Sequence, residues 1–261
     1  MLRATIVQSA LFRTRGLTRH RPFPTKMVYP GLSGQHPLWT DNIEQCHSDI
    51  CEALRANYSA IREDYENLMA AASERSDYVD EEHRLHSGDW DWQSYMKKGE
   101  VSGAFAAQCP NTVNVLETLS HRPVLNSLST STHHDRGEQC QSLFKGVPFG
   151  YAFFSTMGPH SKIEPHYGPC NVRLRCHLPL IVPPGDSCGM EIGGHQVSWK
   201  ENSPIFFDDS YSHHVWNNSD SKRVILLFDL WHPELERDEI EAIKDMFDYL
   251  KNPPAADTQQ D

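Results

Sequence analysis

The chain has 261 residues, 38% of them hydrophobic, and a formal net charge of -11 at pH 7, so it is long enough to bury a sizeable core. The acidic balance argues against nucleic-acid binding, which depends on a basic surface that displaces counterions from phosphates. No apolar run approaches the ~20 residues of a membrane-spanning helix. The seven scattered cysteines include no CxxC pair, so neither a disulfide framework nor a thiolate zinc site is indicated.

The first 28 residues are rich in arginine and contain no Asp or Glu. This composition is typical of a mitochondrial transit peptide, and a disordered basic leader without a targeting role is the alternative. We therefore expect residues 1–28 to be a leader on an intracellular protein, either cytoplasmic or mitochondrial. The sequence does not indicate an oligomeric state.

Residues 29–145 are expected to be mostly helix and loop. Between Asp41 and about Ser76, apolar residues recur three and four positions apart, which predicts one or two helices with an apolar stripe. A further short helix is expected over 111–119, begun by Asn111. Residues 126–142 are polar and rich in helix breakers, so they are expected to form an exposed loop.

After Gly146 the chain consists of short strand-like runs separated by Gly, Pro, Asn and Asp. Many short strands with this punctuation predict a double-stranded β-helix, that is, a cupin-like jelly roll, over 146–235. An amphipathic helix is expected over 236–250, followed by a disordered tail over 251–261. The predicted fold class is thus α+β, mainly β, with residues 29–250 forming a single domain.

One segment of the strand-rich part alternates strictly from Asn171 onward. Its apolar residues would face one way, and Arg173, Arg175 and His177 would share the other face. A strand face with two arginines and a histidine either meets open water or lines a polar cavity that receives an anion, because guanidinium groups are always charged and bind bidentately.

Further polar residues lie in the same strand-rich part of the chain. His166 precedes this strand, and Arg223 stands ten residues after His213. Two histidines with oxygen ligands and open positions are the kind of site that holds Fe(II) for oxygen chemistry. An arginine at that interval could bind a dicarboxylate co-substrate through a charge-assisted bidentate contact. Since His213 and His214 are adjacent, strand alternation allows only one of them to enter the pocket.

Two stretches make a resemblance specific: "EPHYGPCNVRLRCHLPLIVP" from residue 164 and "FFDDSYSHHVWNNSDSKRVILLFDLWHPEL" from residue 206. They resemble the aspartyl/asparaginyl β-hydroxylase family of Fe(II)/2-oxoglutarate-dependent oxygenases. The resemblance runs from "YPGL" at 29 through "SGDW" at 87 to "WHPEL" at 231. It is strongest from about 150 to 235, where HxG, NxRLRxH and FDDSxxHxVW occur in order.

The resemblance implies a role for each of several residues. The metal ligands would be His166 and His213. The contacts to 2-oxoglutarate would come from Ser155, Arg223 and His177, and those to the substrate from Arg173 and Arg175. Gly168 stands where relatives have an acidic ligand, and Asp209 would orient His213 or water from behind.

The implied cofactors are Fe(II) and 2-oxoglutarate, with O2 as co-substrate. The implied reaction is hydroxylation of an Asp- or Asn-like residue in a protein or peptide, with succinate and CO2 as co-products. The chain has only Cys109 where members acting on disulfide-bearing modules have a cysteine pair. Two alternatives therefore stay open: the same chemistry on a free amino acid or small molecule, giving hydroxylation, desaturation or cyclisation, and a catalytically silent jelly-roll binding module.

Overall fold

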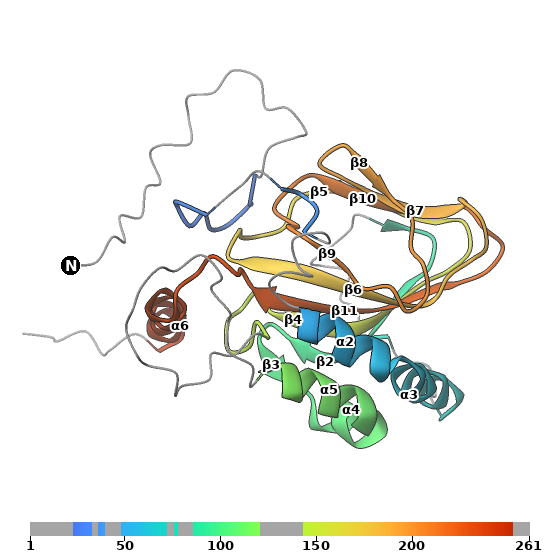
Figure 1. The fold of residues 1–261 in the computed structure, drawn as a ribbon, viewed down its shortest axis with the longest axis horizontal. Helices are drawn as coiled ribbons and strands as arrows, with labels where there is room; N and C mark the ends of the chain where they lie inside the picture. Colours follow the sequence, from blue (N-terminus) through green and yellow to red (C-terminus); the bar gives the residue numbers. More distant parts are fainter. Residues whose placement is uncertain are drawn as a thin grey trace, which may run out of the picture.

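The computed structural model describes residues 23–32, 36–39, 48–71, 76–77, 86–120 and 143–252. Two antiparallel sheets face each other, and helices cover the outer face of the larger one (Figure 1). This arrangement confirms the expected jelly roll with accompanying helices. The loop expected at 126–142, residues 1–22 of the basic leader and the tail beyond residue 252 lie outside the described residues.

The larger sheet has six strands in the order β3-β2-β4-β11-β6-β9, and the smaller has five in the order β1-β5-β10-β7-β8. The strands of the larger sheet are β2 (Trp90–Lys97), β3 (Glu100–Val101), β4 (Tyr151–Met157), β6 (Arg173–Ile181), β9 (Ile205–Phe207) and β11 (Arg223–Trp231). Those of the smaller sheet are β1 (His86–Ser87), β5 (Ser161–His166), β7 (Cys188–Ile192), β8 (His195–Val197) and β10 (His213–Asn217).

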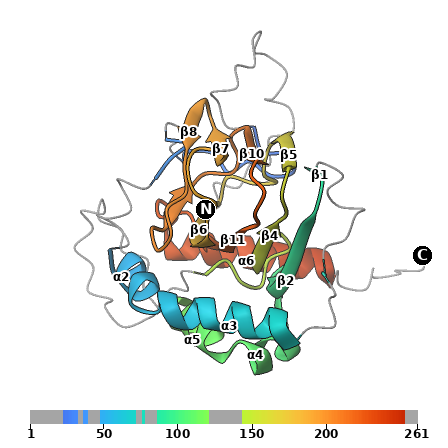
Figure 2. The ribbon, with the colours of Figure 1, turned by 90° about the vertical axis from the view of Figure 1, so that its right-hand side faces the viewer.

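The helices that precede β4 lie below the larger sheet in Figure 2, and the C-terminal helix lies at one end of it in Figure 1. The helices are α2 (Ser48–Ala56), α3 (Tyr58–Ala71), α4 (Gly103–Gln108), α5 (Pro110–Ser120) and α6 (Arg237–Lys251). Within the described residues, no helix is long and apolar enough to cross a membrane.

The apolar stripe expected after Asp41 belongs to α2 and α3. Leu54, Ile61 and Tyr65 are fully buried and share one core with residues of β4, β6 and β11. Burying a side chain of the size of Leu or Ile contributes about 1.5–3 kcal/mol each, so this stripe fixes the helices to the sheet. The larger sheet is thereby left with only one face for polar chemistry.

Strand alternation determines which residues point into the jelly roll. In β6 the even-numbered Leu174, Cys176, Leu178 and Leu180 belong to the helix-covered core, so the odd-numbered residues face the smaller sheet. The predicted common face of the two arginines and His177 is confirmed. The same rule places Arg223 and Asp229 of β11 on the inner face.

The structure differs from expectation in two segments. Residues 29–145 were expected to be mostly helix and loop, yet they contribute β2, which pairs with β4 along its whole length. Residues 23–28 were assigned to the leader, yet their backbone is hydrogen-bonded to the loop after β5, for example from Thr25 N to Gly168 O at 3.0 Å. This part of the expected leader is thus in contact with the domain that was expected to begin at residue 29.

Candidate active site

Two histidines meet across neighbouring strands of the smaller sheet. His166 of β5 and His213 of β10 are paired in register, and their ring centroids are 4.1 Å apart. Nδ1 of His166 lies 2.8 Å from Glu164 O, and Nδ1 of His213 lies 2.9 Å from Tyr211 O. A backbone carbonyl can only accept, so each Nδ1 carries the proton and each Nε2 presents a lone pair. This is the arrangement of metal-binding histidines.

Both rings are held in the neutral form that binds metals. Burial lowers the pKa of His166. Burial, followed by the neighbouring His166, lowers the pKa of His213 well below its ordinary value. Within the described ranges, no three His, Cys, Asp or Glu side chains are arranged to hold a metal ion. What fits a metal here is the pair of neutral imidazoles, whose Nε2 lone pairs are left open by the hydrogen bonds at Nδ1.

His214 lies outside this pair. Its side chain is half-buried, and its ring centroid is 5.5 Å from that of Trp216. The alternation expected for these adjacent histidines is therefore observed, with His213 buried and turned toward His166.

The backbone at Gly168 approaches a buried carboxylate so closely that no side chain fits. A Cβ at this position would lie 2.5 Å from Cγ of Asp209, and Gly168 N donates to Asp209 O at 2.6 Å. Asp209 thus fills the space that an acidic residue at position 168 would need. Consequently, position 168 supplies no carboxylate to the histidine pair.

Arg173 and Arg175 form a buried ionic cluster with Asp209 and Asp229. Nη2 of Arg173 is 2.5 Å from Asp209, and its Nη1 donates to Asp229 at 2.9 Å and to the carbonyl of Phe149. Arg175 donates to both oxygens of Asp229, through Nε at 2.8 Å and Nη2 at 3.2 Å. Its Nη1 lies 3.4 Å from Asp209. The two positive and two negative charges balance.

Two sequence expectations concern this cluster. Arg173 was expected to meet the substrate; it lines the pocket described below, but it is 1% exposed and its donors are engaged by the two aspartates and a carbonyl. Asp209 was expected to orient His213 or water; the hydrogen bond at Nδ1 of His213 is to the carbonyl of Tyr211. Burial alone would raise the pKa of Asp209, but Arg173 and Arg175 outweigh burial and hold it below its usual range. The carboxylate is therefore ionised and paired.

Arg223 is buried in a different environment. Its Nη1 donates to the carbonyl and the hydroxyl of Ser155 at 3.3 and 3.2 Å, and its guanidinium lies 4.9 Å from the ring centroid of Trp199. Nη2 donates to the sulfur of Met157 at 3.5 Å, the thiol of Cys188 is also hydrogen-bonded to the guanidinium, and Nε has no hydrogen-bond partner among the described residues. Burial lowers the pKa of Arg223 to about 10. No carboxylate within the described ranges pairs with it.

His177 completes this second region. It is 4% exposed, and neither of its ring nitrogens has a hydrogen-bond partner within the described part of the chain. Burial and then Arg223 lower its pKa well below the ordinary value, so the ring is neutral. A buried guanidinium edge beside an unpartnered imidazole is suited to an anionic ligand with further hydrogen-bonding groups, since buried polar groups normally have partners.

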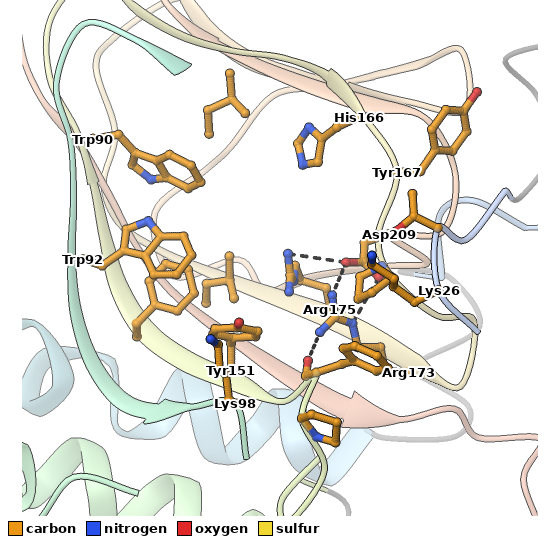
Figure 3. Close-up of a pocket in the computed structure, with 18 residues that line it drawn as sticks. Lys26, Trp90, Trp92, Lys98, Tyr151, His166, Tyr167, Arg173, Arg175 and Asp209 are labelled. Atoms are coloured by element: carbon orange, nitrogen blue, oxygen red, sulfur yellow. Dashed lines mark hydrogen bonds and ion pairs between the residues drawn. The ribbon is translucent and has the colours of Figure 1, made fainter. Parts of the chain in front are cut away.

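A pocket of about 580 Å³ opens beside the histidine pair (Figure 3). Trp90 and Trp92 form one side of it, and Lys26 and Asp209 lie on the opposite side. His166 and Arg175 border it, whereas Arg223 and His177 do not. The Arg223 region adjoins this pocket through Ser155, whose hydroxyl accepts hydrogen bonds from both Trp90 and Arg223.

Comparison with known proteins identifies the family. The family model described as aspartyl/asparaginyl beta-hydroxylase matches residues 55–136 and 137–233, which together make up more than half of the chain. The chain belongs to the aspartyl/asparaginyl β-hydroxylase family. This confirms the resemblance drawn from the sequence.

Similar curated proteins agree with this membership. The chain is 30% identical over 206 residues to the aspartyl/asparaginyl beta-hydroxylase of Mus musculus, covering 78% of this chain and 24% of that protein. It is 31% identical over 202 residues to aspartate beta-hydroxylase domain-containing protein 2 of Mus musculus, covering 75% of this chain and 52% of the relative. The chain therefore spans from about a quarter to about half of the length of these relatives.

Among solved structures, a prolyl-4-hydroxylase from Pseudomonas putida superposes with a TM-score of 0.39 and 12% identity, covering 67% of this chain and 87% of that one. A cupin 2 conserved barrel domain protein from Salinispora arenicola gives a TM-score of 0.29 at 8% identity, covering 67% and 98%.

Several residues of the site were not expected from the sequence. Asp229 pairs both arginines, Trp90 and Trp92 form a pocket wall, and Lys26 reaches the pocket from the supposed leader. One signal was present for Asp229: a lone acidic residue in the apolar run of β11, an even number of residues from Arg223, must face inward and needs a cation.

Proposed function

We propose that this protein is an Fe(II)- and 2-oxoglutarate-dependent dioxygenase that hydroxylates an unactivated carbon of an Asp- or Asn-like residue in a protein or peptide. The carrying observation is that two histidines with open Nε2 atoms lie in the same jelly roll as a buried arginine without an acidic partner among the described residues. Membership of a family described as hydroxylases supports the proposal.

The metal would be held by His166 and His213 through their Nε2 atoms. Their Nδ1 protons are fixed on backbone carbonyls, so the rings are oriented before any metal arrives. Gly168 contributes no ligand. When bound, Fe(II) and 2-oxoglutarate supply the oxidation of a C–H bond by O2, with one oxygen atom entering the product and the other entering succinate as CO2 is lost.

The co-substrate would lie against Arg223. The guanidinium of Arg223, whose Nε has no partner among the described residues, would bind the distal carboxylate of 2-oxoglutarate, and the hydroxyl of Ser155 would add a hydrogen bond. The side chain of Trp90 already donates to that hydroxyl oxygen at 2.9 Å, which holds the serine in place. His177 would contact the carboxylate nearer the metal. Burial of all these groups excludes water and strengthens each contact.

The substrate would occupy the pocket beside His166. Arg175 borders it with a side chain that is 14% exposed, and two of its five N–H groups are not used by the aspartates. We assign to Arg175 the contact with the acid or amide group of the reacting residue. Arg173 acts indirectly, since it holds Asp209 and Asp229 where they position Arg175.

An anaerobic titration of Fe(II) and 2-oxoglutarate tests this proposal. Chelation of iron by the keto acid gives a visible charge-transfer band, which we expect in the wild-type protein and not in His213→Ala. The matched control is His214→Ala, which removes the neighbouring imidazole from the other strand face and should keep the band. Equal loss of the band in both variants, or no band in folded wild-type protein, would refute the assignment.

A further inference from the structure

The pocket has a charge imbalance that the arginine cluster does not explain. Arg173 and Arg175 are neutralised by Asp209 and Asp229, so this cluster carries no net charge with which to attract an anion. The other cationic side chains that line the pocket in the described part of the chain are Lys26 and Lys98. In a protein with a net charge of -11, such a locally positive pocket requires an explanation.

Lys26 is carried by a segment that we call the N-terminal strap, residues 23–29. Its backbone donates from Phe23 to Ser210 O at 2.7 Å, from Thr25 to Gly168 O at 3.0 Å, and from Lys26 to Pro169 O at 2.9 Å. The strap is therefore fastened to the loop that follows the metal ligand His166. The position of Lys26 therefore depends on the loop that begins directly after His166.

The C-terminal end of the strap is fastened more firmly. Tyr29 N donates to Oδ1 of Asn171 at 2.7 Å, and Nδ2 of Asn171 donates back to Tyr29 O at 2.9 Å. The hydroxyl of Tyr29 donates to Glu239 of α6 at 2.7 Å. A segment held at both ends presents its intervening side chains with little loss of entropy on ligand binding.

The side chain of Lys26 is free to bind. It is exposed, it lines the pocket, and it makes no hydrogen bond or ion pair with any described residue. Figure 3 places it beside Asp209 and across the pocket from Trp90 and Trp92. The wall opposite Lys26 is apolar, because Trp92 stacks on Phe153 with ring centroids 4.1 Å apart and Leu227 lies in the same cluster.

We propose that the N-terminal strap is a specificity element, in which Lys26 binds an anionic side chain next to the reacting residue of an acidic peptide. The Trp90–Trp92 wall takes the apolar side chain on the other side of the reacting residue. This inference rests on the proposed function for the identity of the reacting residue. Two groups of the substrate would then be recognised by charge. Arg175 contacts the reacting residue, and Lys26 contacts the anionic side chain next to it.

Two peptides that differ in one charge provide the test: acetyl-Leu-Asn-Glu-amide and acetyl-Leu-Asn-Gln-amide. The reacting Asn is constant, so only the neighbouring charge varies. Binding to the full chain is measured by calorimetry without iron or O2, with the fluorescence of the pocket tryptophans as a second readout. An exposed ion pair is worth up to about 1 kcal/mol, so wild-type protein should prefer the Glu peptide about 3- to 5-fold at low salt.

The variants distinguish a direct contact by Lys26 from a general effect of the protein's charge. We expect Lys26→Gln to abolish the preference, Lys26→Glu to reverse it and Lys26→Arg to retain it. The control Lys200→Glu makes the same charge change at an exposed site outside the pocket and should retain most of the preference. Asn171→Ala, which removes both hydrogen bonds to Tyr29, should weaken the preference while Lys26 is unchanged.

A preference that persists in Lys26→Gln would overturn the inference, as would equal binding of the two peptides or no binding of either. Because the titration contains no metal, it is independent of turnover. Loss of the preference in Lys26→Gln by a protein that forms no succinate would uphold the strap and refute the oxygenase proposal. Succinate formation without any Lys26-dependent preference would do the reverse.

Discussion

Two regions on the inner face of the larger sheet each contain buried guanidinium groups, and they differ in whether carboxylates neutralise the positive charge. Arg173 and Arg175 are paired with two buried aspartates that accept nearly all of their hydrogen bonds. Arg223, which is equally buried, contacts a serine, a sulfur atom and an indole face. In the first region each guanidinium group has carboxylate partners, whereas in the second no carboxylate of the described residues pairs with Arg223.

The difference separates structural residues from binding residues. A buried charge without a partner is expensive, and burial indeed lowers the pKa of Arg223 to about 10. A protein retains such a group where a ligand provides the missing charge. A paired cluster of the same residue type fixes the geometry of the strands, and of its two arginines only Arg175, which borders the pocket, keeps N–H groups for a ligand.

The largest loss of stability is expected from a substitution in the cluster of Arg173 and Arg175 with their two aspartates. Asp229 accepts from Arg173, Arg175 and the backbone N–H of Tyr151. Asp229→Asn would leave two buried guanidinium groups short of a charge and place an amide donor against them. We expect a loss of about 3–5 kcal/mol in the free energy of unfolding, measured by urea denaturation.

The control for this change is Asp220→Asn, in which the same substitution is made at an exposed residue whose partner among the described residues is the exposed His160. It should alter the free energy of unfolding by less than about 0.5 kcal/mol. Equal stability of the two variants would show that the cluster is not a structural element.

A smaller loss is expected where the backbone approaches this cluster. Gly168→Ala places a methyl group 2.5 Å from Cγ of Asp209, so the two loops that carry these residues must move apart. We expect a loss of about 1–3 kcal/mol in unfolding free energy, as for other overpacked sites. Gly103→Ala is the control, because nothing lies within 4 Å of its added Cβ. If both variants unfold alike, Asp209 does not occupy the space next to Gly168.

The sequence predicted the parts of the site that depend on local periodicity. Alternation in β6 put Arg173, Arg175 and His177 on one face, and alternation in β10 allowed only one of His213 and His214 to face inward. These predictions succeed because side chains on a strand point to opposite faces with a period of two.

The remaining features depend on contacts between distant segments. Arg173 was expected to meet substrate because a sequence does not show that Asp209 and Asp229, 36 and 56 residues away, take up its donors. Strand β2 was missed because the alternation of Trp90 and Trp92 with Asp91 and Gln93 is short and breaks at the register shift between Ser94 and Met96. Lys26 was assigned to the leader because arginine-rich composition says nothing about backbone hydrogen bonds to residues more than 140 positions away.

The most direct test of the contrast between the two regions is calorimetric titration of 2-oxoglutarate into the metal-loaded protein without O2, comparing wild type with Arg223→Gln. A hydrogen bond to a charged group contributes about 1.5–3 kcal/mol, so we expect the Kd to rise by roughly 10- to 100-fold, while the unliganded variant is no less stable than wild type. An unchanged Kd, or a loss of stability as large as that of Asp229→Asn, would show that Arg223 is a structural residue like Arg173.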